Sequence, residues 1–347
     1  MASKPKTRLV DAVKADPQRD VAERRQRVAE KALRTKYDTL LGQHEALKRR
    51  FDEMSALADR KPQKPFKVVK AKDKPEATAI VVLSDWHCEE VVHPETVNGL
   101  NEFTPEIAKK RAEAVTQRAL RMIEDSRGLA TVRHLVVGLL GDFFSAYLHE
   151  ELAQTNALSP LRAKCYAADL LERTGKTLLE HSGCDAITFV TCDGNHGRTT
   201  KKVQHHNRQD MSLEADMYRS LARTIQDKRV RWLIEEERGY QTILPIGRHR
   251  VRFMHGDSIK YQGGIGGMTV PVVRQLFYRD STQPADHTFF GHLHRWTPGT
   301  NWTCNGSLIG YTPYAVHCAM PFQEPLQTFA LLDHERGMTR VMKLFCD

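Results

Sequence analysis

Three short runs of apolar, largely β-branched residues constrain the fold of this chain more than any other feature. They are residues 78–83 (TAIVVL), 134–140 (HLVVGLL) and 186–191 (AITFVT). Continuous runs of this length, without alternation of polar residues, are typical of strands that are buried on both faces of a sheet. We therefore expect these runs to be central strands with other layers packed on either side.

Helical segments lie between and after these strands. Residues 104–127 and 159–181 open with Thr-Pro and Ser-Pro, which place a capping hydroxyl before a proline. A third helix is expected at 209–226. Further strands are expected at 240–244, 249–254, 287–290, 326–332 and 339–344. Alternation of strands and helices, followed by a strand-rich second half, predicts a layered α/β fold.

The basic charge is concentrated at one end of the chain. Residues 1–75 contain 21 Lys and Arg and 11 Asp and Glu, a net charge of +10, whereas residues 76–347 contain 31 and 32 and are nearly neutral. A charge-asymmetric tail of this kind indicates a polyanionic partner, such as nucleic acid, or an acidic surface. A solvated helical spacer is the other interpretation, and the sequence leaves both open.

Residues 33–58 of this basic arm carry a heptad pattern, in which apolar residues recur at steps of three and four with His44 in the remaining position. The apolar positions are Leu33, Tyr37, Leu40, Leu47, Phe51, Met54 and Ala58. About three heptads indicate either a homo-oligomeric coiled coil or a helix that packs on its own chain. Residues 61–75 mix Pro with Lys, which marks a linker, so we expect domains at 1–75 and 76–347.

The composition excludes several classes of protein. With 40% hydrophobic residues the chain is neither wholly disordered nor collagen-like, and no apolar run approaches the ~18 residues that cross a bilayer. The 7 Cys are odd in number and form no CxxC pair, which indicates free thiols in a reducing compartment. The start of the chain has no apolar segment of a secretory signal. We expect a soluble, cytoplasmic protein without a membrane partner.

Five of the predicted strands are each followed directly by a short block of residue types that bind metal ions. In chain order the blocks are Asp85-x-His87, Gly-Asp142, Gly-Asn195-His196, His255 and His292-x-His294. In an open α/β sheet, ligands collect outside the carboxyl ends of the strands, so these five blocks are expected to meet in one crevice. A single block of this kind is common in ordinary turns, but five in order at strand ends are not explained in that way.

The expected donor atoms are nitrogen and oxygen only. The set has two Asp, one Asn and four His, and it needs no thiolate, which suits Mn, Fe or Zn and argues against a structural Cys-rich zinc site. Seven side chains suffice for the two shells of a dinuclear centre, whereas a single ion leaves several without a role. We therefore expect two divalent metal ions, with Mn²⁺ as the first choice.

In the order of these blocks, residues 78–345 resemble the calcineurin-like metallophosphoesterases. The segments SDWHCEE and GNHGR are most similar to phage-type members, which are relatives of the nuclease subunit of double-strand-break repair complexes. The resemblance implies an αββα sandwich, in which two packed sheets are flanked by helices and the dimetal site lies at the strand ends. If the protein is encoded by a phage, its expected location is the cytoplasm of the host cell.

The resemblance also implies a role for each residue of the blocks. Asp85, His87 and His294 hold the first ion. Asn195, His255 and His292 hold the second ion, and Asp142 bridges the two. His196 is the general acid that protonates the leaving oxygen. The implied activity is that of a phosphodiesterase, a nuclease that hydrolyses DNA by attack of a metal-bound hydroxide on phosphorus.

Two positions depart from the family pattern. Ser145 stands three residues after Asp142, where the family often has Asp, Asn or His. Gly197 and Arg198 follow His196, where an acidic residue is usual. Neither change removes an expected ligand, and both bear on the preference for substrate.

The loop after the third block is basic and lies next to the expected site. Arg198, Lys201 and Lys202 are expected to grip neighbouring phosphates, with an exposed and solvated loop as the alternative. Two other functions stay open at this point: a phosphatase or nucleotide hydrolase for a small phosphoester, and a scaffold that keeps the fold without turnover. Scaffolds of this fold usually lose ligands, and here all seven are present.

Overall fold

The computed structural model describes residues 17–58, 64–67, 73–147, 152–202, 204, 207–234, 240–260 and 267–347. Its internal contacts divide the chain into two units, residues 1–70 and 71–347. Within the described ranges, no helix is both long enough and apolar enough to cross a membrane. Each unit is described by itself below.

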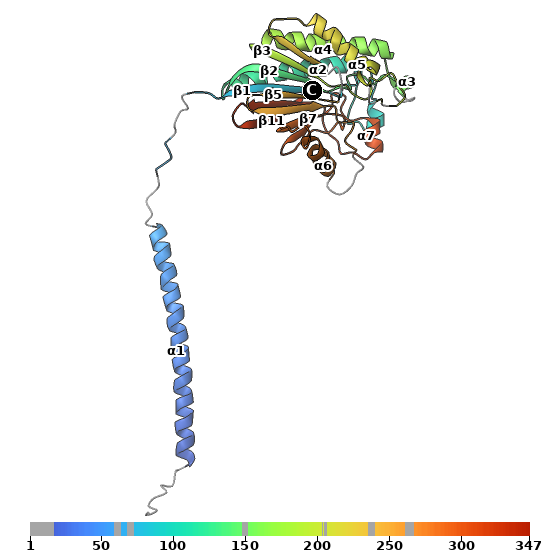
Figure 1. Ribbon diagram of the computed structural model, residues 1–347. Coiled ribbons are helices and arrows are strands. Elements are labelled where there is room, and N and C mark those ends of the chain that lie inside the picture. Colours follow the sequence, from blue (N-terminus) through green and yellow to red (C-terminus); the bar gives the residue numbers. More distant parts are fainter. Residues whose placement is uncertain are drawn as a thin grey trace, which may run out of the picture. The chain divides into compact units, whose positions relative to one another are not determined.

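The described part of the first unit is dominated by one long helix, α1 (Pro17–Ala58; Figure 1). The helix begins well before the predicted heptad pattern and contains all of it. The large apolar side chains of the pattern are 64–69% exposed. They are Leu33, Tyr37, Leu40, Leu47, Phe51 and Met54. Residues 61–63 and 68–72 of the expected linker lie outside the described residues.

The second unit contains two sheets that pack face to face. In sheet order, the larger one consists of β11 (Gly337–Phe345), β10 (Leu326–Asp333), β1 (Glu76–Leu83), β2 (Thr131–Leu139), β3 (Ala186–Thr191) and β4 (Val230–Ile234). The smaller one consists of β5 (Gln241–Ile246), β6 (His249–Met254), β7 (His287–Phe290), β9 (Trp302–Cys304) and β8 (Thr297–Pro298).

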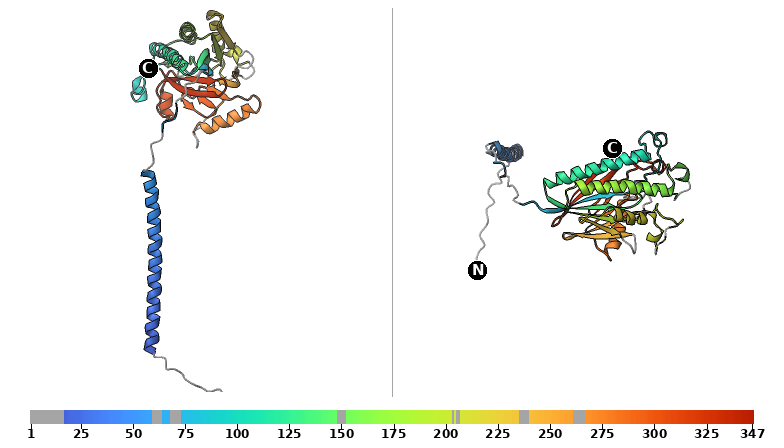
Figure 2. Two further views of the ribbon diagram at one scale, coloured as in Figure 1. Left: turned by 90° about the vertical axis from the view of Figure 1, so that its left-hand side faces the viewer. Right: turned by 90° about the horizontal axis from the view of Figure 1, so that it is seen from above.

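Helices cover the outer faces of both sheets, so the predicted layered αββα sandwich is confirmed (Figures 1 and 2). The helices are α2 (Pro105–Arg127), α3 (Leu152–Thr155), α4 (Pro160–His181), α5 (Leu213–Thr224), α6 (Thr269–Asp280) and α7 (Pro313–His317). Helices α2, α4 and α5 pack on the larger sheet, and α6 packs on the smaller one. Figure 2 shows α2 and α4 side by side along the sandwich.

The alternation of side chains in β1 shows how the layers are held together. Ala79 and Val81 belong to the core between the larger sheet and its helices. Ile80 and Val82 point the other way, into the core between the two sheets. Because successive side chains of a strand alternate between faces, a strand buried on both sides needs the unbroken apolar run seen in the sequence.

Strands β1, β2, β3 and β4 run parallel to one another, and β6, β7 and β9 do so in the smaller sheet. Val81 lies opposite Val137, and Val137 lies opposite Phe189, which keeps the three predicted runs in one register. Parallel strands end at one edge of a sheet, so the polar blocks that follow them are delivered to a common edge.

Most predicted elements are confirmed, and one helix is shorter than expected. Thr104 caps α2, where its hydroxyl accepts from Ile107 N at 3.3 Å. The expected helix at 209–226 is interrupted, because Ser212 adopts an extended conformation and caps α5 through Ala215 N. A separate 3-10 turn covers Gln209–Met211.

The sequence analysis did not predict β4, β8, β9, α3, α6 or α7. Helix α6 starts after Met268, whose side chain makes no cap hydrogen bond, and Pro271 lies inside its first turn. Its apolar residues are also divided, since Val272 and Leu276 are buried whereas Val273 and Phe277 are exposed. Without a capping signal or a clean amphipathic pattern, this helix depends on packing against the sheet.

Candidate metal centre

The loops that follow β1, β2, β3, β6 and β7 meet at one edge of the sandwich. Backbone hydrogen bonds join neighbouring loops: Asp85 N donates to Gly141 O at 2.9 Å, and Gly291 N donates to His255 O at 2.7 Å. The polar blocks are therefore tied together through the main chain as well as through their side chains. The sandwich brings all seven predicted ligands into one region.

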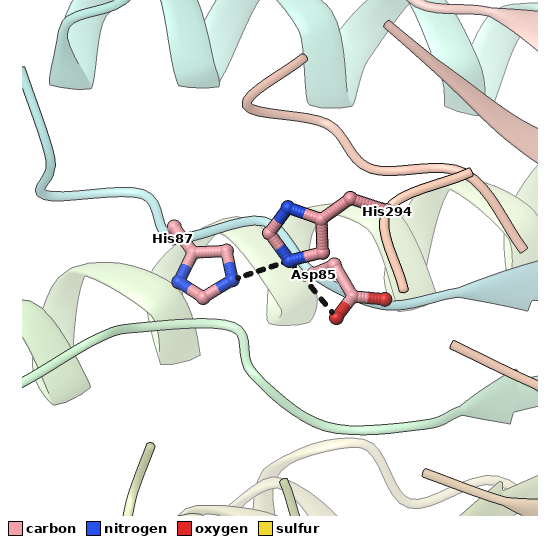
Figure 3. A group of neighbouring side chains, drawn as sticks. All are labelled: Asp85, His87 and His294. Carbon is pink, nitrogen blue, oxygen red and sulfur yellow. Dashed lines mark hydrogen bonds and ion pairs between the residues drawn. The ribbon is translucent and has the colours of Figure 1, made fainter. Parts of the chain in front are cut away.

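Asp85, His87 and His294 form the first cluster, and Figure 3 shows their side chains converging. One possible ligand atom from each lies within 4.8 Å of the others. His87 Nε2 is 3.1 Å from His294 Nε2, which is 3.4 Å from Asp85 Oδ1. Asp85 and His87 are buried, whereas the His294 side chain is 30% exposed. Solvent therefore reaches this cluster from the side of His294.

Asp142, His255 and His292 form a second cluster with the same 4.8 Å limit between ligand atoms. His255 Nε2 lies 2.9 Å from Asp142 Oδ2 and 3.0 Å from Asn195 Oδ1. The two groupings are those that the family resemblance implies. The distances between ligand atoms place Asp142 with the second group, and its bridging role stays a prediction.

The donor set of the second cluster fits a cation. His255 Nδ1 is 2.7 Å from Leu140 O, which only accepts, so Nδ1 carries the ring proton. The Nε2 lone pair then faces two oxygen atoms, from Asp142 and Asn195. Such an arrangement is repulsive unless a positive charge lies between the atoms. A proton on Nε2 supplies that charge in the absence of metal, and a divalent ion can take the place of the proton.

The electrostatics of the centre favour positive charge in the same way. Burial lowers the pKa of His255, but the charge and hydrogen bond of Asp142 outweigh burial and raise it to about 10. Burial likewise opposes protonation of His87, yet a hydrogen bond and the charge of Glu90 raise its pKa to about 9. Burial raises the pKa of Asp142, and the charge of His255 reverses this, so that the pKa lies well below its usual value.

The backbone is strained at the predicted ligands. Five of the seven have a positive φ: Asp85 (57°), His87 (46°), Asp142 (55°), His292 (67°) and His294 (51°). Left-handed conformations are uncommon in residues other than glycine, and they concentrate at functional sites, where the surrounding structure compensates for the strain. In both the Asp-x-His and the His-x-His block, the two residues on either side of x therefore have a left-handed backbone conformation.

Glycines allow the loops to approach one another. A Cβ atom on Gly141 (φ 86°) would lie 2.2 Å from Gly194 N, and a Cβ atom on Gly194 would lie 2.1 Å from Asp142 Oδ1. The Gly-Asp and Gly-Asn-His loops therefore touch backbone to backbone. A side chain at Gly194 would displace the Asp142 carboxylate, and a side chain at Gly141 would push the two loops apart.

Two buried glutamates that the sequence analysis missed hold these loops in place. Glu214 accepts from Gly194 N at 2.6 Å and from Phe143 N at 2.8 Å. Glu89 accepts from the backbone nitrogens of residues 145 and 146 at 2.7 and 2.8 Å. Burial raises the pKa of Glu214 to about 8 and that of Glu89 to about 7. Glu89 follows the first block directly, but nothing in the sequence around Glu214 marks it.

His196 lies beside the first cluster. Its ring meets that of His87 edge to face, with centroids 4.9 Å apart, and its backbone N donates to Asp142 Oδ1 at 2.8 Å. Burial lowers the pKa of His196 to about 4, although the charge of Asp142 opposes this. A phosphate anion next to this ring would raise the pKa and favour the protonated form that a general acid requires.

The predicted phosphate-gripping residues differ in their surroundings. Arg198 directs its guanidinium to backbone carbonyls of its own loop, including Asn195 O at 2.7 Å and Thr200 O at 3.1 Å. Lys201 and Lys202 are exposed. Arg198 thus shapes the turn after a predicted ligand, and contact of these three side chains with phosphate stays a prediction. Residues 203, 205 and 206 of this loop lie outside the described residues.

Neither a family model nor a curated protein matches this chain. Among solved structures, a hypothetical protein from Pyrococcus horikoshii is 13% identical with a TM-score of 0.36, over 78% of this chain and 89% of its own. Vps29 from Entamoeba histolytica complexed with zinc is 11% identical with a TM-score of 0.29, over 77% and 99%. A phosphatase from Mycoplasma pneumoniae is 11% identical with a TM-score of 0.30, over 78% and 93%. Because these values are low, the function is inferred below from the side chains of this chain.

Proposed function

We propose that this protein is a metal-dependent phosphodiesterase that uses a dinuclear centre, and that its substrate is DNA. The observation that carries the proposal is the pair of His/Asp clusters at one edge of the sandwich, each with three possible ligand atoms within 4.8 Å of one another. The motif order resembles that of the calcineurin-like metallophosphoesterases. Nitrogen and oxygen donors without thiolate suit Mn²⁺ first, with Fe or Zn as other choices.

Each cluster holds one ion in this proposal. Asp85, His87 and His294 are ligands of the first ion, and His255, His292 and Asn195 are ligands of the second. Two divalent ions at such a site acidify a bound water and neutralise charge on the phosphate. Asp142 contacts both sides of the centre, because its carbonyl oxygen accepts from His87 N at 3.2 Å and its Oδ2 lies 2.9 Å from His255 Nε2.

His196 supplies the proton in the proposed reaction. Its Nδ1 donates to the carbonyl of Ser145 at 3.3 Å, which leaves Nε2 as the atom that carries the transferable proton. An alkoxide is a poor leaving group, so a positioned imidazolium accelerates diester cleavage by about 10²–10⁴-fold. Its edge-to-face contact with His87 keeps this ring next to the first cluster.

The basic arm supports nucleic acid as the substrate. The net charge of +10 lies in residues 1–75. The exposed helix α1 carries 10 Lys and Arg against 7 Asp and Glu, a net charge of +3, and the remaining +7 lies in the segments of the arm on either side of it. Lys201 and Lys202 add exposed positive charge on the loop that follows His196. Phosphate contacts of this kind give sequence-independent affinity that falls with salt. Deletion of residues 1–75 is expected to lower DNA affinity and to flatten its salt dependence.

The arm also supports self-association. The exposed apolar residues of α1 repeat at the a and d spacing of a coiled coil, and we place a second copy of the same helix against them. The flanking positions carry Arg34, Lys36, Lys48 and Arg50, whose side chains frame the apolar stripe with positive charge. A dimer would bring two basic arms to one DNA molecule and raise the apparent affinity.

Activity assays with matched leaving groups test the proposal. With Mn²⁺, the protein is expected to hydrolyse bis-p-nitrophenyl phosphate and labelled DNA faster than p-nitrophenyl phosphate. His196→Ala should lose about 10²–10⁴-fold on DNA but much less on the nitrophenyl diester, because nitrophenolate leaves without an acid. His181→Ala, which changes an exposed imidazole at the end of α4, is the control.

Two outcomes would contradict the proposal. Turnover of the monoester with DNA left intact would indicate a phosphatase or nucleotide hydrolase for small phosphoesters. No turnover of any substrate with Mn²⁺, Fe²⁺, Zn²⁺ or Mg²⁺ would indicate a scaffold that keeps the fold and the ligands without catalysis.

A further inference from the structure

Ser145 contacts both imidazoles that lie next to each other in the centre. Its Oγ is 2.5 Å from His87 Nδ1, and its carbonyl oxygen is 3.3 Å from His196 Nδ1. Its backbone N donates to Glu89 Oε1 at 2.7 Å, which fixes the main chain on the third side. Ser145 is fully buried, so none of these contacts competes with water.

Glu90 completes this group from the loop after β1. The Ser145 hydroxyl donates to Glu90 Oε1, and the same oxygen lies 3.3 Å from His87 Nδ1. The Glu90 side chain is only 19% exposed and the His87 side chain 3%. A carboxylate thus lies on the side of the His87 ring opposite to the nitrogen that faces the first cluster.

The hydrogen-bond direction in this group follows from the types of the atoms. An ionised carboxylate only accepts, so the Ser145 hydroxyl donates to Glu90 and its oxygen accepts from His87 Nδ1–H. The ring proton of neutral His87 is then on Nδ1. Its Nε2 has a lone pair, and this is the atom that lies 3.1 Å from His294 Nε2 in the first cluster.

We propose that Glu90, acting through Ser145, is a positioning residue that selects the metal-binding tautomer of His87 and keeps its ring oriented towards the first ion. This inference rests on the proposed function in that it assumes a metal ion at the first cluster. Carboxylates or carbonyls that accept from the second ring nitrogen of a metal-binding histidine commonly have this effect. In this chain the carboxylate reaches the ring through a serine, at the position where the family resemblance leads one to expect Asp, Asn or His.

We call Glu90 and Ser145 the relay. Its two members are not equivalent, and this difference gives a test that a purely structural role would not pass. In Ser145→Ala, Glu90 Oε1 is near enough to His87 Nδ1 to accept its proton directly. In Glu90→Ala, the Ser145 hydroxyl has lost its acceptor and turns its proton towards His87 Nδ1. The ring proton then moves to Nε2, where it blocks the ligand atom. Loss of Glu90 should therefore be more harmful than loss of Ser145.

Titration of the full-length protein with Mn²⁺, followed by the EPR signal of the free ion, measures the effect. The wild type is expected to bind two ions, and Glu90→Ala is expected to bind one of them about 10–100-fold more weakly. Ser145→Ala and Glu90→Gln should lose less, because each retains an acceptor oxygen for the relay. Ser126→Ala is the control, since it removes a buried hydroxyl that bonds only within α2.

A second measurement needs no metal. In protein labelled with ¹⁵N at histidine, the tautomer of His87 is read from its ring nitrogen shifts at a pH above about 9, where the ring is neutral. It should be Nδ1–H in the wild type and Nε2–H in Glu90→Ala. Circular dichroism and thermal unfolding check that each variant folds. If Glu90→Ala does not fold, Glu90→Leu, which fills the same space without an acceptor oxygen, decides the case in the same two measurements.

The possible failures are distinguishable. If Glu90→Ala, or Glu90→Leu in its place, binds both ions as the wild type does and keeps the Nδ1–H tautomer, the positioning role is overturned. If Ser145→Ala binds Mn²⁺ more weakly than Glu90→Ala does, the proposed order of the relay is wrong. A wild-type protein that binds no Mn²⁺ refutes the proposed function, and the tautomer measurement in metal-free protein then decides the role of Glu90 by itself.

Discussion

Replacement of Arg208 should weaken the binding of the second ion and leave the binding of the first nearly unchanged. Its guanidinium pairs with Asp257 at 2.9 Å, with side chains only 8% and 18% exposed. It also donates to the backbone carbonyls of Asp193 at 2.8 Å and Gly194 at 3.3 Å. These contacts join the loop after β3 to the loop after β6, and each of these loops carries a predicted ligand of the second ion.

The size of the effect follows from burial of the pair. Arg208→Met keeps the aliphatic stem but leaves Asp257 with no cation, and breaking one side of a buried ion pair costs about 3–5 kcal/mol. Because Asp257 retains some contact with solvent, we expect the lower end, about 3 kcal/mol. Asp257→Asn removes the stranded charge, so the double variant should recover about 1–2 kcal/mol of that loss.

Urea unfolding in EDTA measures these free energies without metal, and Mn²⁺ titration then reports the two ions. Arg208→Met is expected to weaken one ion and leave the other nearly unchanged. Arg229→Met is the matched control, because Arg229 pairs with Asp227 at 3.0 Å in contact with solvent, and solvent-exposed pairs contribute little to stability. Strict additivity in the double variant, or equal weakening of both ions, would refute the reasoning.

Three further predictions address the bridge, the smaller sheet and the arm. Asp142→Asn should weaken both ions by more than about tenfold in the Mn²⁺ titration; loss of only one ion would show that Asp142 does not bridge. Burial lowers the pKa of His287 to about 4, so this ring stays neutral in the folded protein while the unfolded chain takes up a proton below pH ~6.5. The contribution of His287 to stability is therefore fully present above that pH and should fall by about 3 kcal/mol on acidification to pH 4. Urea unfolding across this range should show a flatter profile for His287→Asn, and an unchanged profile would count against this account. Leu47→Asp should convert a dimer to a monomer in sedimentation equilibrium, whereas Arg49→Ala, on the outer face of the heptad, should not; a monomeric wild type would exclude self-association through α1.

Local patterns were sufficient for the central strands. The β1 run needs no tertiary information, since a continuous apolar segment of this length is stable only when both faces are covered. Thr104 and Pro105 likewise predict the start of α2, because capping is a local interaction. Helix α6 was missed because its stability comes from Val272 and Leu276 packed on the smaller sheet, and that contact has no local signal.

The residues that support the ligands were also beyond sequence reasoning. Glu214 and Arg208 lie in segments whose patterns are ordinary, a helix start and a basic loop. Their importance comes from burial against loops that are remote in sequence: Glu214 bonds to Phe143 N across 71 positions, and Arg208 pairs with Asp257 across 49. A charged side chain reveals such a role only when its partners are known.

The amino-acid sequence by itself determined which Asp, Asn and His side chains follow the strands and in what order along the chain, because each block follows a strand whose apolar run is a local property. Only the tertiary structure decided which of these side chains face one another. His87 and His294 are 207 positions apart, yet their Nε2 atoms lie 3.1 Å from each other, since parallel strands of two packed sheets end at one edge. Distances of this kind are set by the packing of the layers and by left-handed turns at the ligands, and neither is encoded in the spacing of residues along the chain.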